Sequence, residues 1–148
     1  GDSAAAMRAE GLLPVCRDGS AEMVRTANEL YQLDASVALF SELDDNNIYD
    51  GVWANFSLLH APKSEFPHLI SALHTSLKPH GWLFVALKLG DGEMRDKFGR
   101  HYAYYEEGEL DFILIKAGFA VDEKIYGKSR GMAGTDEPWI GGFYQKSA

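Results

Sequence analysis

Residues 49–56 are expected to form a strand, and its end and the turn after it carry side chains that could bind or react with a ligand. Ligands of open α/β sheets bind outside the carboxyl ends of the strands, so we expect Asn55 and Phe56 to line a binding site. An imidazole exchanges protons near neutral pH, which makes His60 a candidate general base for a substrate proton. The structural alternatives are that Phe56 packs in the core and that Asn55 and His60 cap neighbouring segments.

A glycine-rich and charged segment, residues 88–105, offers a second set of candidate groups. Lys88 or Arg100 would pair with an anionic group of a substrate, and Tyr104 would contribute to the same site. A loop of this length in a compact domain is usually functional or disordered, so we expect a lid over the site. The alternative is an exposed charged loop with no role.

The cysteine and the remaining histidines suggest no chemistry of their own. Cys16 lies in an apolar run, where a thiol is usually an inert part of the core. His68 and His74 do not share a helix face, and neither they nor His80 and His101 show the spacing to acids or cysteine that is typical of metal ligands. We therefore expect no metal site.

Helices and strands must alternate to position these groups. The pattern predicts helices over residues 2–10, 20–31, 62–77 and 110–117, and strands over residues 12–16, 36–40, 49–56, 82–87, 120–126 and 139–145. In the second helix, capped by Ser20, one apolar face is expected to hold Met23, Ala27, Leu30 and Tyr31. Strand–helix alternation that closes on two successive strands predicts an α/β fold, with a mostly parallel sheet and an antiparallel finish.

Composition narrows the class of protein. The 148 residues are 46% hydrophobic with a formal charge of -8, and this acidity argues against a dedicated nucleic-acid binder. No window approaches the roughly 18 uncharged apolar residues of a membrane span, and no charged start precedes an apolar run as in a signal peptide. The single cysteine suits a reducing compartment. We expect a cytoplasmic protein that acts on a small molecule.

Several motifs resemble the class I S-adenosylmethionine-dependent methyltransferases. Val15–Met23 resembles the end of that family's second strand, where an acid precedes a helix opening with Ser-x-Glu-Met. Tyr49–His60 resembles its fourth strand, Leu77–Gly81 the Leu-Lys-Pro-Gly-Gly before the fifth, and Ala117–Phe119 the Ala-Gly-Phe before the sixth. The segment Lys88–Glu93 is similar to one bacterial branch. The resemblance implies a Rossmann-like, mostly parallel sheet with helices on both faces and an antiparallel C-terminal strand pair.

The resemblance also implies a cofactor, S-adenosyl-L-methionine, and residues that bind it. Asp18 matches the acid that binds both ribose hydroxyls, a task for which a carboxylate is suited because it accepts two hydrogen bonds from a vicinal diol. Glu42 stands where the family places a polar residue near the adenine amino group. The alternatives are a solvated acid at a strand end for Asp18 and a plain loop acid for Glu42. The implied cofactor-binding residues are Gly1, Asp18, Gly19, Met23, Glu42, Leu43, Asn55 and Phe56.

One departure from the family concerns its beginning. The family's first strand and most of its glycine-rich loop precede the residues matched here, so we expect residues 1–148 to be one methyltransferase domain without them. Gly1 is either the last glycine of that loop or the remnant of a tag. In the family, the first strand separates the strands matched by residues 12–16 and 49–56. We therefore expect these two strands about 10 Å apart, rather than directly paired.

The expected activity is transfer of the sulfonium methyl group to a small-molecule acceptor by in-line displacement. That chemistry depends mostly on orientation and proximity, with a base needed only if the acceptor loses a proton. Two alternatives remain. The missing glycine loop favours a non-catalytic methyltransferase-like domain that binds a partner. A nicotinamide-dependent oxidoreductase of similar topology is disfavoured by the paired final strands.

Overall fold

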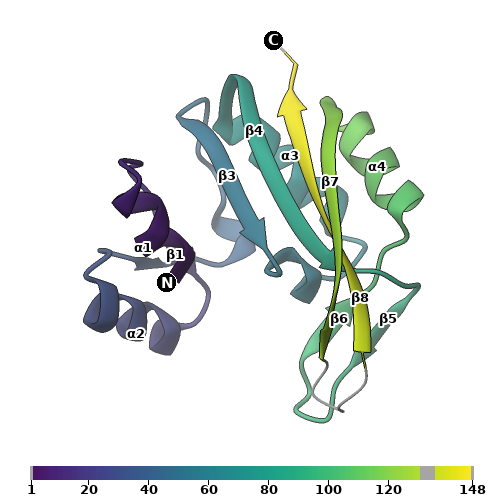
Figure 1. Ribbon diagram of the computed structural model, residues 1–148, viewed down its shortest axis with the longest axis horizontal. Helices are drawn as coiled ribbons and strands as arrows, with labels where there is room; N and C mark the ends of the chain where they lie inside the picture. Colours follow the sequence, from purple (N-terminus) through teal and green to yellow (C-terminus); the bar gives the residue numbers. More distant parts are fainter. Residues whose placement is uncertain (1, 131–135, 148) are drawn as a thin grey trace. The chain divides into compact units, whose positions relative to one another are not determined.

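The computed structural model describes residues 2–130 and 136–147, and the chain divides into two compact units, Gly1–Leu43 and Asp44–Ala148 (Figure 1). Helices and strands alternate, which confirms the predicted α/β class. The elements are α1 (Asp2–Ala9), β1 (Arg17–Asp18), α2 (Ala21–Tyr31), β2 (Ser36–Val37), η1 (Phe40–Glu42), β3 (Tyr49–Asn55), η2 (Leu58–His60), α3 (Phe66–Ser76), β4 (Leu77–Lys88), β5 (Glu93–Arg95), β6 (His101–Ala103), α4 (Glu107–Lys116), β7 (Phe119–Arg130) and β8 (Asp136–Lys146). No helix in the described segments is long and apolar enough to cross a membrane.

In the first unit, β1 and β2 form a two-stranded parallel sheet. β1 comprises Arg17–Asp18, so the strand predicted at residues 12–16 is wrong in position. Pro14 has no N–H to donate, which prevents a regular ladder through the middle of the apolar run, and Leu13 is 94% exposed. The second strand is likewise shorter than predicted, because the chain soon turns into η1.

The helix α2 begins as predicted but packs differently. The Ser20 Oγ accepts a hydrogen bond from the Met23 N–H at 3.3 Å, which confirms the cap. Within α2, the buried residue is Val24, whereas Met23 and Leu30 are 55% and 67% exposed. The predicted apolar face is therefore wrong. Asn28, one turn from Val24, fixes this orientation by bonding through its side chain to both the N–H and the carbonyl of Ala35.

The second unit contains a four-stranded sheet of order β3-β4-β8-β7. β3 pairs in parallel with β4, whereas β8 is antiparallel to both of its neighbours. Three strands therefore run in one direction, and the last two form the antiparallel pair expected from the sequence. Among the described strands, β3 pairs with β4 alone, and the predicted spacing between residues 12–16 and 49–56, which lie in different units, stays a prediction.

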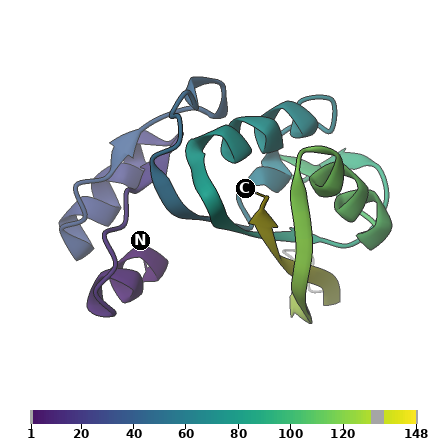
Figure 2. The ribbon, with the colours of Figure 1, turned by 90° about the horizontal axis from the view of Figure 1, so that it is seen from above.

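The helices α3 and α4 pack on this sheet beside β4 and β7 (Figures 1 and 2). From β4, Leu83, Val85 and Leu87 are completely buried, and from α3 so are Phe66 and Ile70. Phe84 and Ala86 of β4 are 5% and 0% exposed as well, so residues 83–87 are all buried, as expected of an interior strand. This core holds the carboxyl ends of β3 and β4 in place, and those ends carry the candidate site.

Residues 88–105, predicted as one long loop, instead contain a β-hairpin. β5 and β6 pair in antiparallel fashion, and Asp96 closes the turn between them. Its Oδ1 accepts the backbone N–H groups of Phe98 at 2.9 Å and Arg100 at 3.0 Å. The loop prediction is wrong because each strand is only three residues long, too short for its alternation of side chains to be recognised.

The packing of His74 on α3 predicts a dependence of stability on pH. Burial, and then the positive charge of Lys146, lower the pKa of His74 below its usual 6.5. As the pH falls below 6.5, the His74 imidazole takes up a proton in the unfolded chain but stays neutral to lower pH in the folded chain. The folded state therefore loses stability on the acid side. We expect the free energy of unfolding to fall less between pH 7 and pH 5 in His74→Gln than in the wild type, as measured by urea unfolding.

His68→Gln, exposed on the same helix, is the control for this experiment. An equal fall in the wild type and His74→Gln would contradict the prediction.

Candidate active site

A cavity of about 280 Å³ lies at the carboxyl ends of β3 and β4 in the second unit. Its walls come from these strand ends, η2, β6, β7 and β8, through Phe56, Leu59, His60, Lys88, Tyr102, Ser129 and Trp139. Three residues singled out in the sequence, Phe56, His60 and Lys88, therefore meet at one site. They do so because parallel neighbouring strands end at the same edge of a sheet.

Phe56 is held in an uncommon backbone conformation where β3 ends. Its φ is 54°, in the left-handed region that non-glycine residues rarely adopt. The conformation is supported by a hydrogen bond from its N–H to the Ala86 carbonyl at 3.0 Å. Its ring meets that of Trp139 edge to face, with the centroids 5.6 Å apart. Strained backbone of this kind is concentrated at ligand sites, where it directs a side chain that regular structure would turn away.

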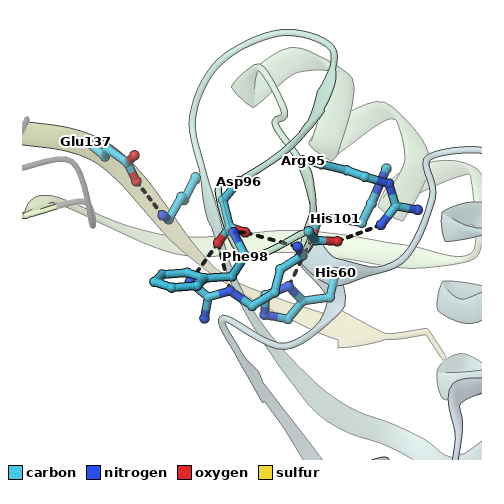
Figure 3. A network of polar contacts seen from close by, with 9 residues as sticks. His60, Arg95, Asp96, Phe98, His101 and Glu137 are labelled. Atoms are coloured by element: carbon cyan, nitrogen blue, oxygen red, sulfur yellow. Dashed lines mark hydrogen bonds and ion pairs between the residues drawn. The ribbon is translucent and has the colours of Figure 1, made fainter.

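His60 is oriented by the hairpin. Its Nδ1 donates a hydrogen bond to the backbone carbonyl of His101 at 3.0 Å (Figure 3), and its ring lies edge-on to Tyr102, with the centroids 5.0 Å apart. Because a carbonyl can only accept, Nδ1 carries the hydrogen, which leaves Nε2 of the neutral ring as an acceptor. The hairpin thus sets the tautomer that a general base requires.

Lys88 brings to the cavity a positive charge that a neighbouring carboxylate already balances. Its ammonium forms an ion pair with Glu137 (Figure 3) and lies 4.7 Å from the centre of the Tyr102 ring. The side chains of Lys88 and Glu137 are only 18% and 26% exposed. An ion pair so screened from water contributes a dipole to the cavity rather than a net charge.

Arg100 does not line the cavity but supports a ring that does. Its guanidinium pairs with Asp96 at 2.7 Å and lies 5.6 Å from the centre of the Tyr102 ring. The hydrogen bond to Asp96 raises the pKa of Arg100. For the Asp96 carboxyl, burial alone would raise the pKa, but hydrogen bonds from Arg100 and Phe98 lower it. The pair therefore stays ionised and holds the hairpin turn.

Two other predicted residues lie outside the lining of this cavity. Tyr104 is half-buried, and burial, followed by the charge of Glu137, raises its pKa. It packs against Gly90, where a Cβ would lie 3.1 Å from the Tyr104 Cβ. Asn55 is exposed at the end of β3. Their roles as ligand-binding residues remain predictions.

Trp139 and Ser129 were not identified as site residues from the sequence. Trp139 reaches the cavity across Gly127 of β7, its partner in the antiparallel ladder. A Cβ on Gly127 would lie 2.5 Å from the indole, so any larger residue there would displace the ring. A glycine in the interior of a strand often marks such a close approach, and this was the available signal.

In the first unit, the predicted cofactor-binding acid Asp18 ends β1, and Glu42 ends η1, which comes after the neighbouring parallel strand β2. The Asp18 Oδ1 accepts the Ser20 N–H at 2.8 Å, and the Glu42 Oε1 accepts the Leu39 N–H at 2.7 Å. Gly19, next to Asp18, packs against Leu39, which precedes η1: a Cβ on Gly19 would lie 3.4 Å from the Leu39 Cδ2. The structure therefore brings Asp18, Gly19 and the start of η1 together at the ends of β1 and β2.

The other cofactor-binding predictions in this unit are less specific. Met23 is exposed in the first turn of α2, and Leu43 is half-buried after η1. Gly1 lies outside the described residues. Between residues 2 and 130 and between 136 and 147, no three His, Cys, Asp or Glu side chains are grouped so that they could hold a metal ion.

No protein-family model and no curated protein matches the sequence, but solved structures match the fold. The 1,6-didemethyltoxoflavin-N1-methyltransferase of Burkholderia thailandensis, with 1,6-didemethyltoxoflavin and S-adenosylhomocysteine bound, has a TM-score of 0.80 at 21% identity, over 100% of this chain and 67% of that chain. A methyltransferase from Methanosarcina mazei has a TM-score of 0.73 at 18% identity, over 88% and 80% of the two chains. The [4+2]-cyclase SpnF has a TM-score of 0.65 at 20% identity, over 89% and 65%.

A fold can host several chemistries, and the cyclase among these neighbours is an example. What the neighbours share with this chain is its architecture, and in the methyltransferases this agrees with the motifs at the strand ends. The chain has the class I S-adenosylmethionine-dependent methyltransferase fold.

Proposed function

We propose that the protein transfers a methyl group from S-adenosylmethionine to a small-molecule acceptor. The observation that carries the proposal is the cavity at the ends of β3 and β4, where a base of defined tautomer, His60, lies among aromatic rings. Open α/β sheets bind their ligands at this edge. The neighbouring structure from Burkholderia thailandensis supports the proposal, because it has an acceptor molecule and S-adenosylhomocysteine bound.

The residues at the ends of β1 and η1 fit the nucleoside part of the cofactor. The Asp18 carboxylate is exposed and suited to a vicinal diol, and Gly19 beside it allows the close approach of a ligand. We assign the adenine contact to Glu42. The remaining contacts are assigned to Gly1, Met23, Leu43, Asn55 and Phe56. When bound, the cofactor would supply an electrophilic methyl group.

The chain's own contribution to the reaction is orientation and proton removal. Phe56, Tyr102 and Trp139 would hold and orient the acceptor, which raises the effective concentration of the reacting groups. The His60 Nε2 would take the proton that the acceptor loses, while the carbonyl of His101 keeps Nδ1 protonated. Lys88 would donate a hydrogen bond to the acceptor.

Arg100 and Tyr104, predicted to bind substrate, have a supporting role in this proposal. The Arg100 guanidinium lies against the Tyr102 ring, and its own charge is balanced by Asp96. Tyr104 packs the segment that joins the hairpin to the rest of the second unit. Both residues thereby shape the acceptor site through Tyr102 rather than by direct pairing with an anion.

The cofactor assignment is tested by calorimetric titration with S-adenosylhomocysteine. We expect saturable binding by the wild type. Asp18→Ala should weaken it roughly 10- to 100-fold, because a hydrogen bond to a charged group is worth about 1.5–3 kcal/mol. Asp18→Asn keeps an acceptor for the Ser20 N–H and separates loss of the charge from loss of the turn. Glu29→Ala, exposed on α2, is the control. Undiminished binding by Asp18→Ala would remove the assignment, and no binding by the wild type would contradict the proposed function.

A further inference from the structure

The walls of the cavity are suited to a flat molecule. Phe56, Tyr102 and Trp139 present aromatic rings from the ends or edges of different strands, and Leu59 adds an apolar side chain that is 1% exposed. Aromatic rings pack best against other rings, by offset stacking or edge-to-face contact. The volume of about 280 Å³ lies just below the roughly 300–1,000 Å³ typical of small-molecule pockets. It therefore favours a ligand of one or two fused rings.

The charges at the cavity disfavour two classes of ligand. A cation would meet the Lys88 ammonium, and it would find the Tyr102 ring already in contact with the cations Lys88 and Arg100. An anion would find the charge of Lys88 already balanced by Glu137, so it would gain little to offset its own desolvation. An uncharged ligand incurs neither cost.

The hydrogen-bonding groups match one edge of such a ring. The His60 Nε2 is an acceptor and the Lys88 ammonium is a donor, whereas the Ser129 hydroxyl can do either. His60 and Lys88 both lie against the Tyr102 ring, at 5.0 and 4.7 Å from its centre, so one ligand can reach both. A lactam edge, with an N–H beside a C=O, offers the complementary pair.

On the basis of the proposed function, we infer that the acceptor is an uncharged heteroaromatic lactam of one or two rings. It is methylated on its ring nitrogen. In this reaction the ring N–H bond breaks and its proton passes to the His60 Nε2. The electron pair left on nitrogen forms the new N–CH₃ bond, and the electron pair of the broken sulfur–methyl bond stays on sulfur. Lys88 stabilises the negative charge that builds up on the lactam oxygen during proton loss.

The inference is tested by calorimetric titration of the S-adenosylhomocysteine-saturated chain with four probes. We expect saturable binding of 2-quinolone and about tenfold weaker binding of 1-methyl-2-quinolone, which has no N–H for His60. Choline, a cation, and benzoate, an anion, should not saturate. With S-adenosylmethionine in place of the product, mass spectrometry should detect 1-methyl-2-quinolone formed from 2-quinolone.

Variants separate the cavity from the rest of the fold. Trp139→Leu should weaken 2-quinolone binding at least about tenfold, as loss of a stacking ring does elsewhere, and by more than it weakens S-adenosylhomocysteine binding. Phe112→Leu, 66% exposed on α4, is the matched control and should change neither. Lys88→Met combined with Glu137→Gln removes both charges and avoids an unpaired buried carboxylate. This double variant should also weaken 2-quinolone binding.

The outcomes distinguish the inference from the function on which it rests. Tighter binding of choline or benzoate than of 2-quinolone, no saturable binding of 2-quinolone, or an undiminished affinity in Trp139→Leu would overturn the inference. If S-adenosylhomocysteine binds and 2-quinolone does not, the acceptor class alone is wrong. If S-adenosylhomocysteine does not bind, the proposed function is wrong, and titration of 2-quinolone into the free chain still tests the cavity.

Discussion

Replacement of His60 by glutamine is expected to lower the rate of methyl transfer by about 10²- to 10⁴-fold, the usual contribution of a positioned general base. The His60 Nε2 is the acceptor in this cavity whose protonation is set by a neighbour, since Nδ1 is bonded to the His101 carbonyl. A glutamine side chain can still donate to that carbonyl, but its amide does not take up a proton near neutral pH. The variant therefore keeps the local structure and loses the base.

The measurement that isolates this role is the turnover rate at saturating acceptor, together with the Michaelis constant. Loss of a base lowers kcat and leaves KM nearly unchanged, whereas a collapsed pocket raises KM. His68→Gln, exposed on α3, is the matched control. If His60→Gln turned over as fast as the wild type, His60 would not be the base, and orientation alone would account for the reaction.

The central part of the site could be predicted because it depends on a general property of α/β sheets. Parallel strands whose carboxyl ends meet at one edge bring together the residues that follow them, and Phe56, His60 and Lys88 meet in this way. Trp139 could not be placed from its own surroundings in the sequence. Its position depends on which residue of β7 it opposes, and that register is set by long-range pairing across Gly127.

The errors in the fold prediction have local causes. The apolar run at residues 12–16 has the composition of a strand, yet Pro14 cannot contribute an N–H to a ladder. In the segment at residues 88–105, the hairpin is stabilised by Asp96, which binds the backbone N–H groups of its own turn. Hydrogen bonds of this kind depend on backbone geometry, and a pattern of apolar residues does not reveal them.

Phe66→Ala is expected to lower the free energy of unfolding of the second unit by about 3–5 kcal/mol, as is typical when a buried phenylalanine is truncated. Phe66 is 0% exposed in the first turn of α3. Its ring packs on Tyr105, itself 1% exposed, with the centroids 4.7 Å apart. Since Tyr105 closely follows β6, this contact also fixes the strand that carries Tyr102 into the cavity, so ligand affinity should fall along with stability.

The measurement is denaturant unfolding followed by tryptophan fluorescence, which reports on the second unit because all three tryptophans, Trp53, Trp82 and Trp139, lie in it. Phe112→Ala removes the same ring from a position that is 66% exposed. That control should change the free energy of unfolding by no more than about 0.5 kcal/mol. A loss below about 1 kcal/mol for Phe66→Ala would mean that the space is refilled by neighbouring side chains. In that case the Phe66 ring would not be required to hold Tyr105, or the hairpin that precedes it, in place at the cavity.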